Sequence, residues 1–509
     1  MAGAPFQAPT IDLSGTGATK TARRIGCSLV PVIVGMVIIG FVISAVRSCD
    51  ISTTSSSFHG PTFNSSSMLT LSGGATVLPG DGPEADLVVI TQETKDSTTT
   101  RRIARVSFTK DGSKLVWQSE PVDDSAYRAE VAVVGNTLFA GIDDNLYALD
   151  AKTGKTQWRA TLHDKVTTGC PSCFSAVGDR LVVRTTDAFV SGYGTASSES
   201  LWTKRLNSTS GSISVVGDRL FVVDDPEDAS QLTTATLTDP TNGKAVRTVT
   251  PRCPKSDSNP YDVEMDAGDA VHAIPGGADV VAAFGFGDAC VVRWNPGTGA
   301  IRWTSRLTGM STIDQDSVLI GTQDLVVSNT SNQLVAVSLT KGTAEQLKVP
   351  NDLQATANQI VGRTLVANTK TGRGTPRNGL MAWDLGSAQQ LWAQSTLGAT
   401  QPVSESAYHS SDALFDGSPR SLLVPVGQGL NLFTFEGTQH TFTVAPLDLR
   451  TGDLGTPVRR AYLTAYESGT PSLAIEGQQD PRLFVTIDTL LQAIPVSGHG
   501  DVVPFPEPN

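Results

Sequence analysis

Charged and aromatic side chains are scarce in this 509-residue sequence, at 17% and 6% of its residues. The six histidines stand apart, and the sequence contains no HExxH helix, GxSxG elbow or Walker phosphate loop. Those motifs carry the chemistry of zinc proteases, α/β-hydrolases and P-loop nucleotidases, so none of these classes is indicated. A catalytic triad could still assemble from distant loops. From the sequence we assign no catalytic residue, no cofactor and no metal ligand.

Basic residues are fewer than acidic residues. The chain has 38 Lys and Arg against 50 Asp and Glu, which gives a formal net charge of −12. No run of basic residues is longer than a pair. Nucleic acids and anionic membrane surfaces both require basic patches, so neither is expected as a binding partner.

Cysteine occurs only six times, in a pattern that fits an oxidising compartment. Four of the six are candidates for disulfides: Cys170, Cys173, Cys253 and Cys290. The spacing of Cys170 and Cys173 is also that of a thiol-exchange motif or half a zinc site, but no second CxxC completes such a zinc site. We favour a structural loop disulfide there, with a redox or metal role as the alternative. Cys253 and Cys290 flank a long insertion. A disulfide between them is one option, which spacing alone does not prove.

Acidic residues cluster at three places, Asp123–Asp124, Asp143–Asp144 and Asp224–Asp228. Hairpin turns often carry such residues. Calcium binding is the alternative, although this cation needs six to eight oxygen ligands.

A repeat dominates the rest of the sequence. The segment Leu146–Trp158 reads LYALDAKTGKTQW, and close copies occupy Val291–Trp303 and Leu380–Trp392. Each copy has an apolar run, an Asp or Asn, a turn, and a Trp eight residues after the Asp or Asn. A recurring unit of this length predicts stacked supersecondary modules rather than one conventional core.

Aligning the Trp and the turn glycine gives eight units whose anchors lie 41 to 64 residues apart. In three units another residue takes the place of Trp: Arg247, Gln346 and Thr456. The other five units have a Trp, for which we predict a structural role in docking one module onto the next: Trp117, Trp158, Trp202, Trp303 and Trp392. An aromatic platform for a sugar or cofactor is the alternative for any one of them.

Each unit contains signals of β-structure. Short Val-rich runs alternate with Gly, Asp, Asn and Ser, as in LVVRTTDAFVSGYG (Leu181–Gly194), and no helical period is sustained beyond residue 68. The glycines of the repeat fit tight turns better than phosphate binding. Trp294 and Trp383 occupy a different position, equivalent to Leu149, and are expected in the core.

The repeat resembles that of the pyrroloquinoline-quinone-like (PQQ-like) propeller family, whose consensus is similar to YALDaxTGkxxW. This resemblance implies an all-β propeller, and the eight anchors predict an eight-bladed β-propeller, with seven or nine blades as alternatives. Three strand-like runs follow the last anchor, and a strand near 68–72 or 75–78 could complete them into one blade built from both chain ends. The family includes quinoprotein dehydrogenases and also non-enzymatic envelope scaffolds. The adjacent cysteines that many of these dehydrogenases carry are missing here.

The N-terminal part contains an apolar segment, Ile25 to Val46, with 22 residues and no charge. A helix of this length spans a hydrocarbon layer of about 30 Å. Basic residues precede it at Lys20, Arg23 and Arg24, which predicts a cytoplasmic N-terminus and an extracytoplasmic remainder. We favour an uncleaved signal anchor over a cleaved signal peptide, because the apolar segment is long and 24 residues precede it.

Five regions are therefore expected along the chain. They are a cytoplasmic tail (1–24), a transmembrane helix (25–46), a Ser/Thr-rich linker (47–67), the propeller (68–498) and a C-terminal tail (499–509).

The sequence favours a membrane-anchored extracytoplasmic propeller that serves as a scaffold for another envelope protein or peptide. Two insertions are the expected contact regions, Pro251–Asp269 and Gln401–Arg420. A quinone-dependent dehydrogenase or a carbohydrate-active propeller is the alternative. Ligand sensing is a third option, but it would need an output domain supplied by a partner.

Overall fold

A computed structural model shows how the repeats fold. It describes residues 70–504 except for these gaps: 79–84, 96–97, 110–111, 123–129, 168–171, 227–231, 256–261, 267–268, 286–287, 311–312, 314–317, 330–332, 372–377, 395–399, 403–419, 437–440, 462–472, 480–481, 488–489 and 499–501. The described residues form strands and no helix, as the sequence predicted. The predicted tail, transmembrane segment and linker lie outside them. Among the described residues, no helix is long and apolar enough to cross a membrane.

The described strands form nine sheets of four or five strands and one two-stranded sheet. Eight of the larger sheets have four strands in chain order. The first four of these are β1 (Thr70–Val77), β2 (Ala85–Lys95), β3 (Thr98–Thr109), β4 (Gly112–Val122); β5 (Glu130–Val134), β6 (Thr137–Ile142), β7 (Asn145–Asp150), β8 (Thr156–Thr161); β9 (Phe174–Val177), β10 (Arg180–Arg184), β11 (Phe189–Tyr193), β12 (Ser200–Arg205); and β13 (Ser212–Val216), β14 (Arg219–Asp224), β15 (Thr234–Thr238), β16 (Ala245–Val249).

The second half of the chain continues the pattern. After the small sheet β17 (Arg252–Cys253) and β18 (Val263–Glu264) come β19 (His272–Ala273), β20 (Val280–Phe284), β21 (Ala289–Trp294), β22 (Ile301–Leu307); β23 (Val318–Ile320), β24 (Asp324–Ser328), β25 (Leu334–Ser338), β26 (Ala344–Leu347); β27 (Leu353–Val361), β28 (Thr364–Thr371), β29 (Asn378–Asp384), β30 (Gln389–Gln394); the five-stranded β31 (Thr400–Pro402), β32 (Arg420–Val426), β33 (Gly429–Glu436), β34 (Thr441–Leu447), β35 (Val458–Ala461); and β36 (Leu473–Gln479), β37 (Arg482–Ile487), β38 (Leu490–Pro495), β39 (Val503–Pro504). The last strand lies beyond residue 498, where the sequence placed the end of the propeller.

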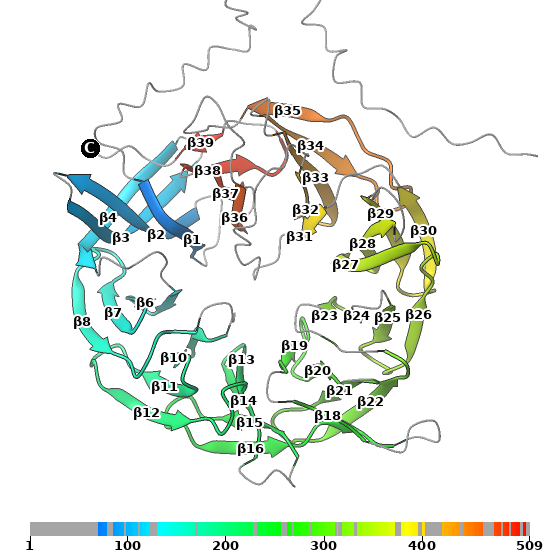
Figure 1. Ribbon diagram of the computed structural model, residues 1–509, viewed down its shortest axis with the longest axis horizontal. Helices are drawn as coiled ribbons and strands as arrows, with labels where there is room; N and C mark the ends of the chain where they lie inside the picture. Colours follow the sequence, from blue (N-terminus) through cyan, green and yellow to red (C-terminus); the bar gives the residue numbers. More distant parts are fainter. Residues whose placement is uncertain are drawn as a thin grey trace, which may run out of the picture. The chain divides into compact units, whose positions relative to one another are not determined.

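Within the unit that spans residues 66–509, the sheets follow one another around a ring (Figure 1). Nine buried apolar clusters join them, and each cluster draws its residues from two large sheets that are neighbours in the ring, one cluster also including the small sheet β17–β18. The cluster that contains Phe108 and Phe484 joins the last sheet to the first, with the two ring centroids 5.3 Å apart. The middle strands are buried on both faces because each sheet is covered by two others, which explains their continuous apolar runs.

This arrangement bears on two predictions about ring closure. The sequence predicted eight units, with seven or nine as alternatives, and nine sheets of four or five strands are present among the described residues. The strand near residues 70–77 does not complete the last sheet, because β1 pairs with β2 in the first sheet, while β36–β39 form a sheet of their own. The C-terminal segment supplies all four of its own strands, so no exchange between the chain ends is required.

The repeated Trp and Gly lock each sheet to the next one. Trp303 lies over the turn glycine of the following sheet, Gly342, where an added Cβ would come within 2.7 Å of the indole. Trp117, Trp202 and Trp392 lie over the equivalent glycines in the same way. Each indole N–H also donates a hydrogen bond to a turn carbonyl, as from Trp303 to Leu339 at 3.1 Å. The glycine is favoured by its positive φ and required by the ring that covers it.

Units without this Trp show why the two residues go together. The side chain of Arg247 lies over Gly299 in place of an indole. After Gln346, the following turn has Ala388 at φ 53°, where four units with Trp are followed by Gly154, Gly243, Gly342 or Gly452. The shorter Gln346 therefore accompanies an alanine in the neighbouring turn, whereas Arg247 still lies 2.9 Å from the place of a Cβ at Gly299.

Candidate functional site

The order of the strands gives the ring two different faces. Turns between the first and second strands of a sheet, and between the third and fourth, lie on one face, which we call the turn face. Turns between the second and third strands, and the links from one sheet to the next, lie on the other, which we call the link face. The insertion Pro251–Asp269 belongs to the link face because it connects β16 to β19.

The insertion forms a small hairpin tied to the ring by a disulfide. Strands β17 and β18 pair antiparallel, with Cys253 opposite Val263. Cys253 is bonded to Cys290 of β21, and their Cα atoms are 5.7 Å apart. The structure therefore contains the Cys253–Cys290 disulfide, which the sequence analysis gave as one option. The cross-link holds the insertion against the fifth sheet.

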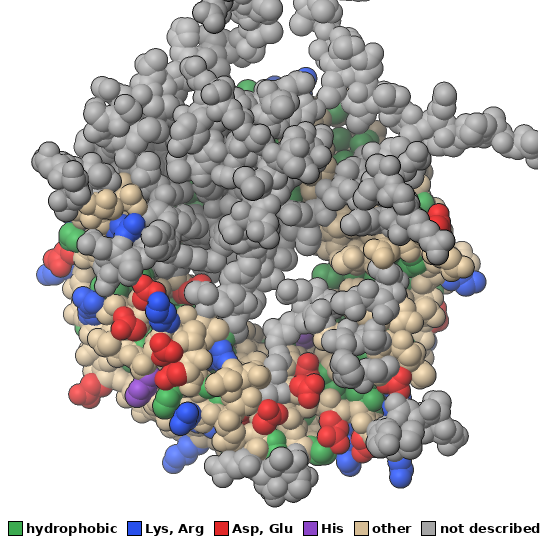
Figure 2. Space-filling model, in the orientation of Figure 1, with side chains coloured by type: hydrophobic (Ala, Val, Ile, Leu, Met, Phe, Trp, Pro, Cys, Tyr) green, Lys and Arg blue, Asp and Glu red, His purple; other side chains and the backbone are tan. Residues whose placement is uncertain are grey.

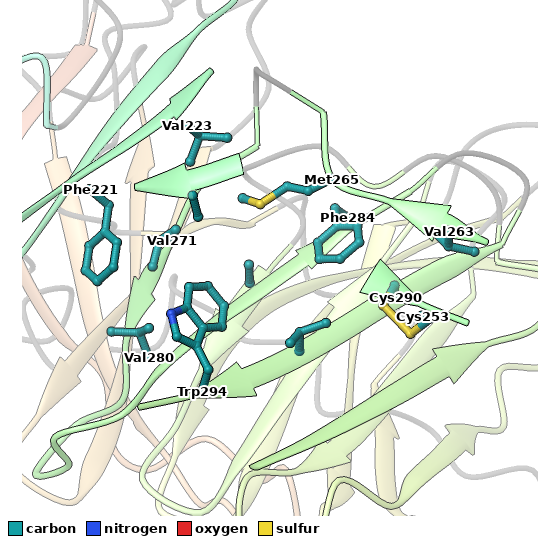
Figure 3. Close-up of a cluster of buried hydrophobic side chains, with 13 residues drawn as sticks. Phe221, Val223, Cys253, Val263, Met265, Val271, Val280, Phe284, Cys290 and Trp294 are labelled. Atoms are coloured by element: carbon teal, nitrogen blue, oxygen red, sulfur yellow. A yellow bond between two sulfur atoms is a disulfide. The ribbon is translucent and has the colours of Figure 1, made fainter. Parts of the chain in front are cut away.

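Apolar side chains under the hairpin complete its attachment (Figure 3). Val263 and Met265 are buried and join the same cluster as Phe284, Cys290 and Trp294. Complete burial of Trp294 confirms its predicted place in the core, and Trp383 is equally buried in another cluster. The hairpin is therefore part of the core between the fourth and fifth sheets rather than a loose loop.

A buried ion pair supports the hairpin from the other side. Arg306 and Asp288 are both nearly covered, with their closest N and O atoms 2.9 Å apart. The same guanidinium donates to the carbonyl of Pro254 at 3.0 Å. Asp288 also accepts the backbone N–H of Gly309 at 2.8 Å. This network fixes the base of the insertion without using the disulfide.

The outward side of the hairpin is charged and exposed. Arg252, Lys255 and Glu264 all lie on it in contact with solvent. Arg252 pairs with Asp262 at 3.3 Å, and Asp262 also accepts the backbone N–H of Lys255. A rigid support with charges of both signs at its surface can present a fixed pattern to another polar surface.

Two titratable groups at the end of the insertion have shifted pKa values. Burial raises the pKa of the Asp269 carboxyl to about 7, although a hydrogen bond from the Asp266 N–H opposes this shift. Burial lowers the pKa of His272 to about 4. At neutral pH His272 is therefore uncharged, and Asp269 is close to half protonated. No group of three or more His, Cys, Asp or Glu among the described residues is arranged to hold a metal ion.

The structure places the other candidate residues apart from this site. Cys173 is disulfide-bonded and buried in the cluster between the third and fourth sheets, while Cys170 lies outside the described residues. The five Trp of the repeat all donate to the following sheet, including Trp158 to Thr195. Most of the second predicted contact region, Gln401–Arg420, also lies outside the described residues. Sequence reasoning missed Met265, because a single apolar residue in a polar insertion gives no periodic signal.

Comparison with known proteins identifies the family. The sequence model of the family described as "Outer membrane protein assembly factor BamB" matches residues 102–250 and 174–410. Together these matches cover more than half of the chain. The chain belongs to this PQQ-like repeat family.

Solved structures with a similar arrangement differ widely in sequence. BamB from Moraxella catarrhalis is 15% identical, with 72% of this chain and 95% of that one covered and a TM-score of 0.40. The computationally designed Ika8 protein is 14% identical, with 77% and 98% covered and a TM-score of 0.41. A europium-containing methanol dehydrogenase is 11% identical, with 82% and 84% covered and a TM-score of 0.36. No curated protein sequence matches this chain.

Proposed function

We propose that this protein is a membrane-anchored, nine-bladed propeller that binds another envelope protein or peptide through its link face. Membership of the family described as an outer membrane protein assembly factor is the observation that carries the proposal. The stapled insertion between the fourth and fifth sheets is the proposed contact region. Its disulfide and buried ion pair hold exposed charges in fixed positions, which lowers the entropy lost on binding.

The proposal also includes an anchor and a location. The uncharged segment 25–46 would cross the membrane once, with residues 1–24 in the cytoplasm. The Ser/Thr-rich segment 47–67 would then tether the propeller outside the membrane. The disulfide between Cys253 and Cys290 is compatible with an oxidising compartment.

Site-specific photo-crosslinking in intact cells tests the contact region. A photoreactive amino acid would replace Lys255 or Glu264, which are exposed on the insertion, in the full-length chain. We expect one dominant envelope protein to be cross-linked from both positions and identified by mass spectrometry. The matched control places the same group at Lys341, an exposed turn-face residue, where this cross-link should be absent.

Two results would contradict the scaffold function. One is equal cross-linking from the insertion and from Lys341, or no envelope protein from either. The other is enzymatic activity: a clear rise in the melting temperature of the full-length protein with pyrroloquinoline quinone and calcium, together with dye-linked oxidation of alcohols or sugars. That outcome would favour the dehydrogenase alternative.

A further inference from the structure

A cavity of about 610 Å³ opens among the links around the third and fourth sheets. Its lining includes Asp187 from the β10–β11 turn, Arg205, Asn207 and Thr209 along the link from β12 to β13, and Pro226 after β14. All of these segments lie on the link face. Two further lining residues, Ala188 and Leu206, belong to the apolar cluster between the third and fourth sheets, whereas the polar lining residues are not part of that cluster.

The guanidinium of Arg205 is held in place by aromatic packing. Its Cζ lies 5.8 Å from the ring centroid of Phe189, the residue opposite it in the β11–β12 pair. His163 stacks on Phe189 with centroids 4.4 Å apart and planes 15° apart. A cation over an aromatic face is stabilised without using its N–H groups. Arg205 has no ion-pair or hydrogen-bond partner within the described part of the chain.

A second arginine, which does not line the cavity, is bonded to one of the lining residues, Thr209. Arg184 is 8% exposed and donates to the carbonyl of Thr209 at 2.7 Å and to the hydroxyl of Thr167 at 3.0 Å. Its Nε is buried and has no partner among the described atoms. Neither bond is to a carboxylate, so the positive charge of Arg184 is not neutralised by an ion pair within the described residues.

The carboxylates nearby already have donors. Asp187 accepts the hydroxyl hydrogen of Thr185 at 2.6 Å. Asp224 accepts the backbone N–H groups of Asn207 and Ser208. The amide nitrogen of Asn207 donates to the carbonyl of Asp225, so it too is occupied. The hydrogen-bond donors that the cavity still offers are the planar fork of Arg205 and the hydroxyl of Thr209, and the charged carboxylate of Asp187 lies in the same lining.

The type of ligand follows from these free groups. An arginine fork matches a carboxylate, which it can bind through two parallel hydrogen bonds. A sugar would need an open aromatic face, and the ring of Phe189 is already in contact with His163 and Arg205. Figure 2 shows charges of both signs mixed over the sheets from β5 to β16, so no single-sign field would attract a polyanion.

We propose that this cavity binds a carboxylate of a partner peptide, with Arg205 as its main ligand. The inference rests on the proposed scaffold function and names the chemistry of one contact. The carboxylate can come from an acidic side chain or from a chain terminus, and both present the same two oxygens to the guanidinium.

Saturation-transfer NMR on the full-length protein in detergent micelles tests the proposal with three acetylated pentapeptides. Gly-Gly-Glu-Gly-Gly amide carries a side-chain carboxylate, Gly-Gly-Gln-Gly-Gly acid carries a terminal one, and Gly-Gly-Gln-Gly-Gly amide carries none. We expect transfer to at least one of the first two and none to the third. The peptide that responds identifies the source of the carboxylate.

Variants show whether the signal comes from this cavity. Arg205→Gln should weaken binding at least fivefold, and Arg205→Lys should restore part of it, because a lysine keeps the charge and loses the fork. Arg219→Gln, on the turn face, should leave binding unchanged. Equal binding of all three peptides, no binding of any, or an Arg205→Gln variant that binds like wild type would overturn the inference. The cross-linking result from the insertion would stand in each case, so the two proposals fail separately.

Discussion

At the scale of single residues, the most constrained positions are the turn glycines under the indole rings. The sequence repeat shows Gly and Trp in the same unit, but the contact is between the Trp of one unit and the Gly of the next. The pair therefore reports packing between modules rather than a local motif. Ala388, which follows a unit without Trp, shows that a positive φ alone does not demand glycine.

Replacing Gly342 by alanine should lower the stability more than the same change at Gly217. Both residues have a positive φ, which costs an alanine about 1–2 kcal/mol. At Gly342 the new Cβ would also collide with Trp303, which adds about 1–3 kcal/mol, whereas at Gly217 no atom lies within 4 Å. Urea denaturation of both variants measures the difference. Equal losses of unfolding free energy would show that the indole moves away freely.

Asp269 and His272 should give opposite pH dependences. The pKa of folded Asp269 is raised to about 7, so the folded state binds the proton more tightly and its contribution to stability falls as pH rises from about 4 to 7. The pKa of folded His272 is lowered to about 4, so its contribution to stability rises with pH between about 4 and 6.5. In the wild type these two effects offset each other over much of the same range.

Single substitutions should separate these effects in thermal melts between pH 4 and pH 8. The stability of Asp269→Asn relative to wild type should increase with pH, because the variant removes the cost of a buried carboxylate. The gain in stability of His272→Gln over wild type should be largest at low pH and should vanish near neutral pH. Asp218→Asn, at an exposed carboxyl, is the control and should give a flat difference. A flat difference for Asp269→Asn as well would show that its carboxyl is hydrated.

At the scale of elements, the sequence predicted strands, turns and the Trp contacts well, because each unit repeats the same packing problem. The strand-like runs of the last sheet were recognised, but an N-terminal strand was expected to complete them, because the sheet lacks the Trp of the repeat. Its turn glycine, Gly498, has a positive φ and packs against Val444 and Val458, two branched residues that do not stand out in a sequence. The cavity was also missed, since His163, Phe189 and Arg205 come from three different strands or links and share no spacing.

The stapled hairpin should open when its disulfide is removed. The bond closes a segment with a sequence separation of 37, and the loss of such a constraint costs up to about 4 kcal/mol. Trypsin should therefore cut after Arg252 and Lys255 faster in the Cys253→Ser, Cys290→Ser double variant than in wild type. Mass spectrometry of the fragments locates the cuts. Arg306→Gln is a useful comparison, because it removes the bond to Pro254 while it keeps the disulfide. If the double variant is cut no faster than wild type, the apolar underside and the ion pair hold the hairpin by themselves.

At the scale of the whole molecule, the proposed anchor predicts how the protein partitions. With segment 25–46 intact, the protein should stay in the membrane fraction after alkaline carbonate extraction and dissolve only in detergent. A chain that starts at residue 47 behind a cleavable signal peptide should be released in soluble form. N-terminal sequencing of the mature protein distinguishes the two topologies. A mature N-terminus beyond residue 46 would mean that the segment is a signal peptide.

The contact between the first and last sheets suggests that this chain could be circularly permuted. Their contact, made through Phe108 and Phe484 and by β1 against β36 and β4 against β39, puts the first and last strands of the propeller in adjacent sheets without any strand passing between them. A short peptide could therefore join residue 504 to residue 70, and new termini could be opened at another link, such as the one between β26 and β27. Such a circular permutant should fold to the same ring, with its chain ends moved three sheets along the circumference.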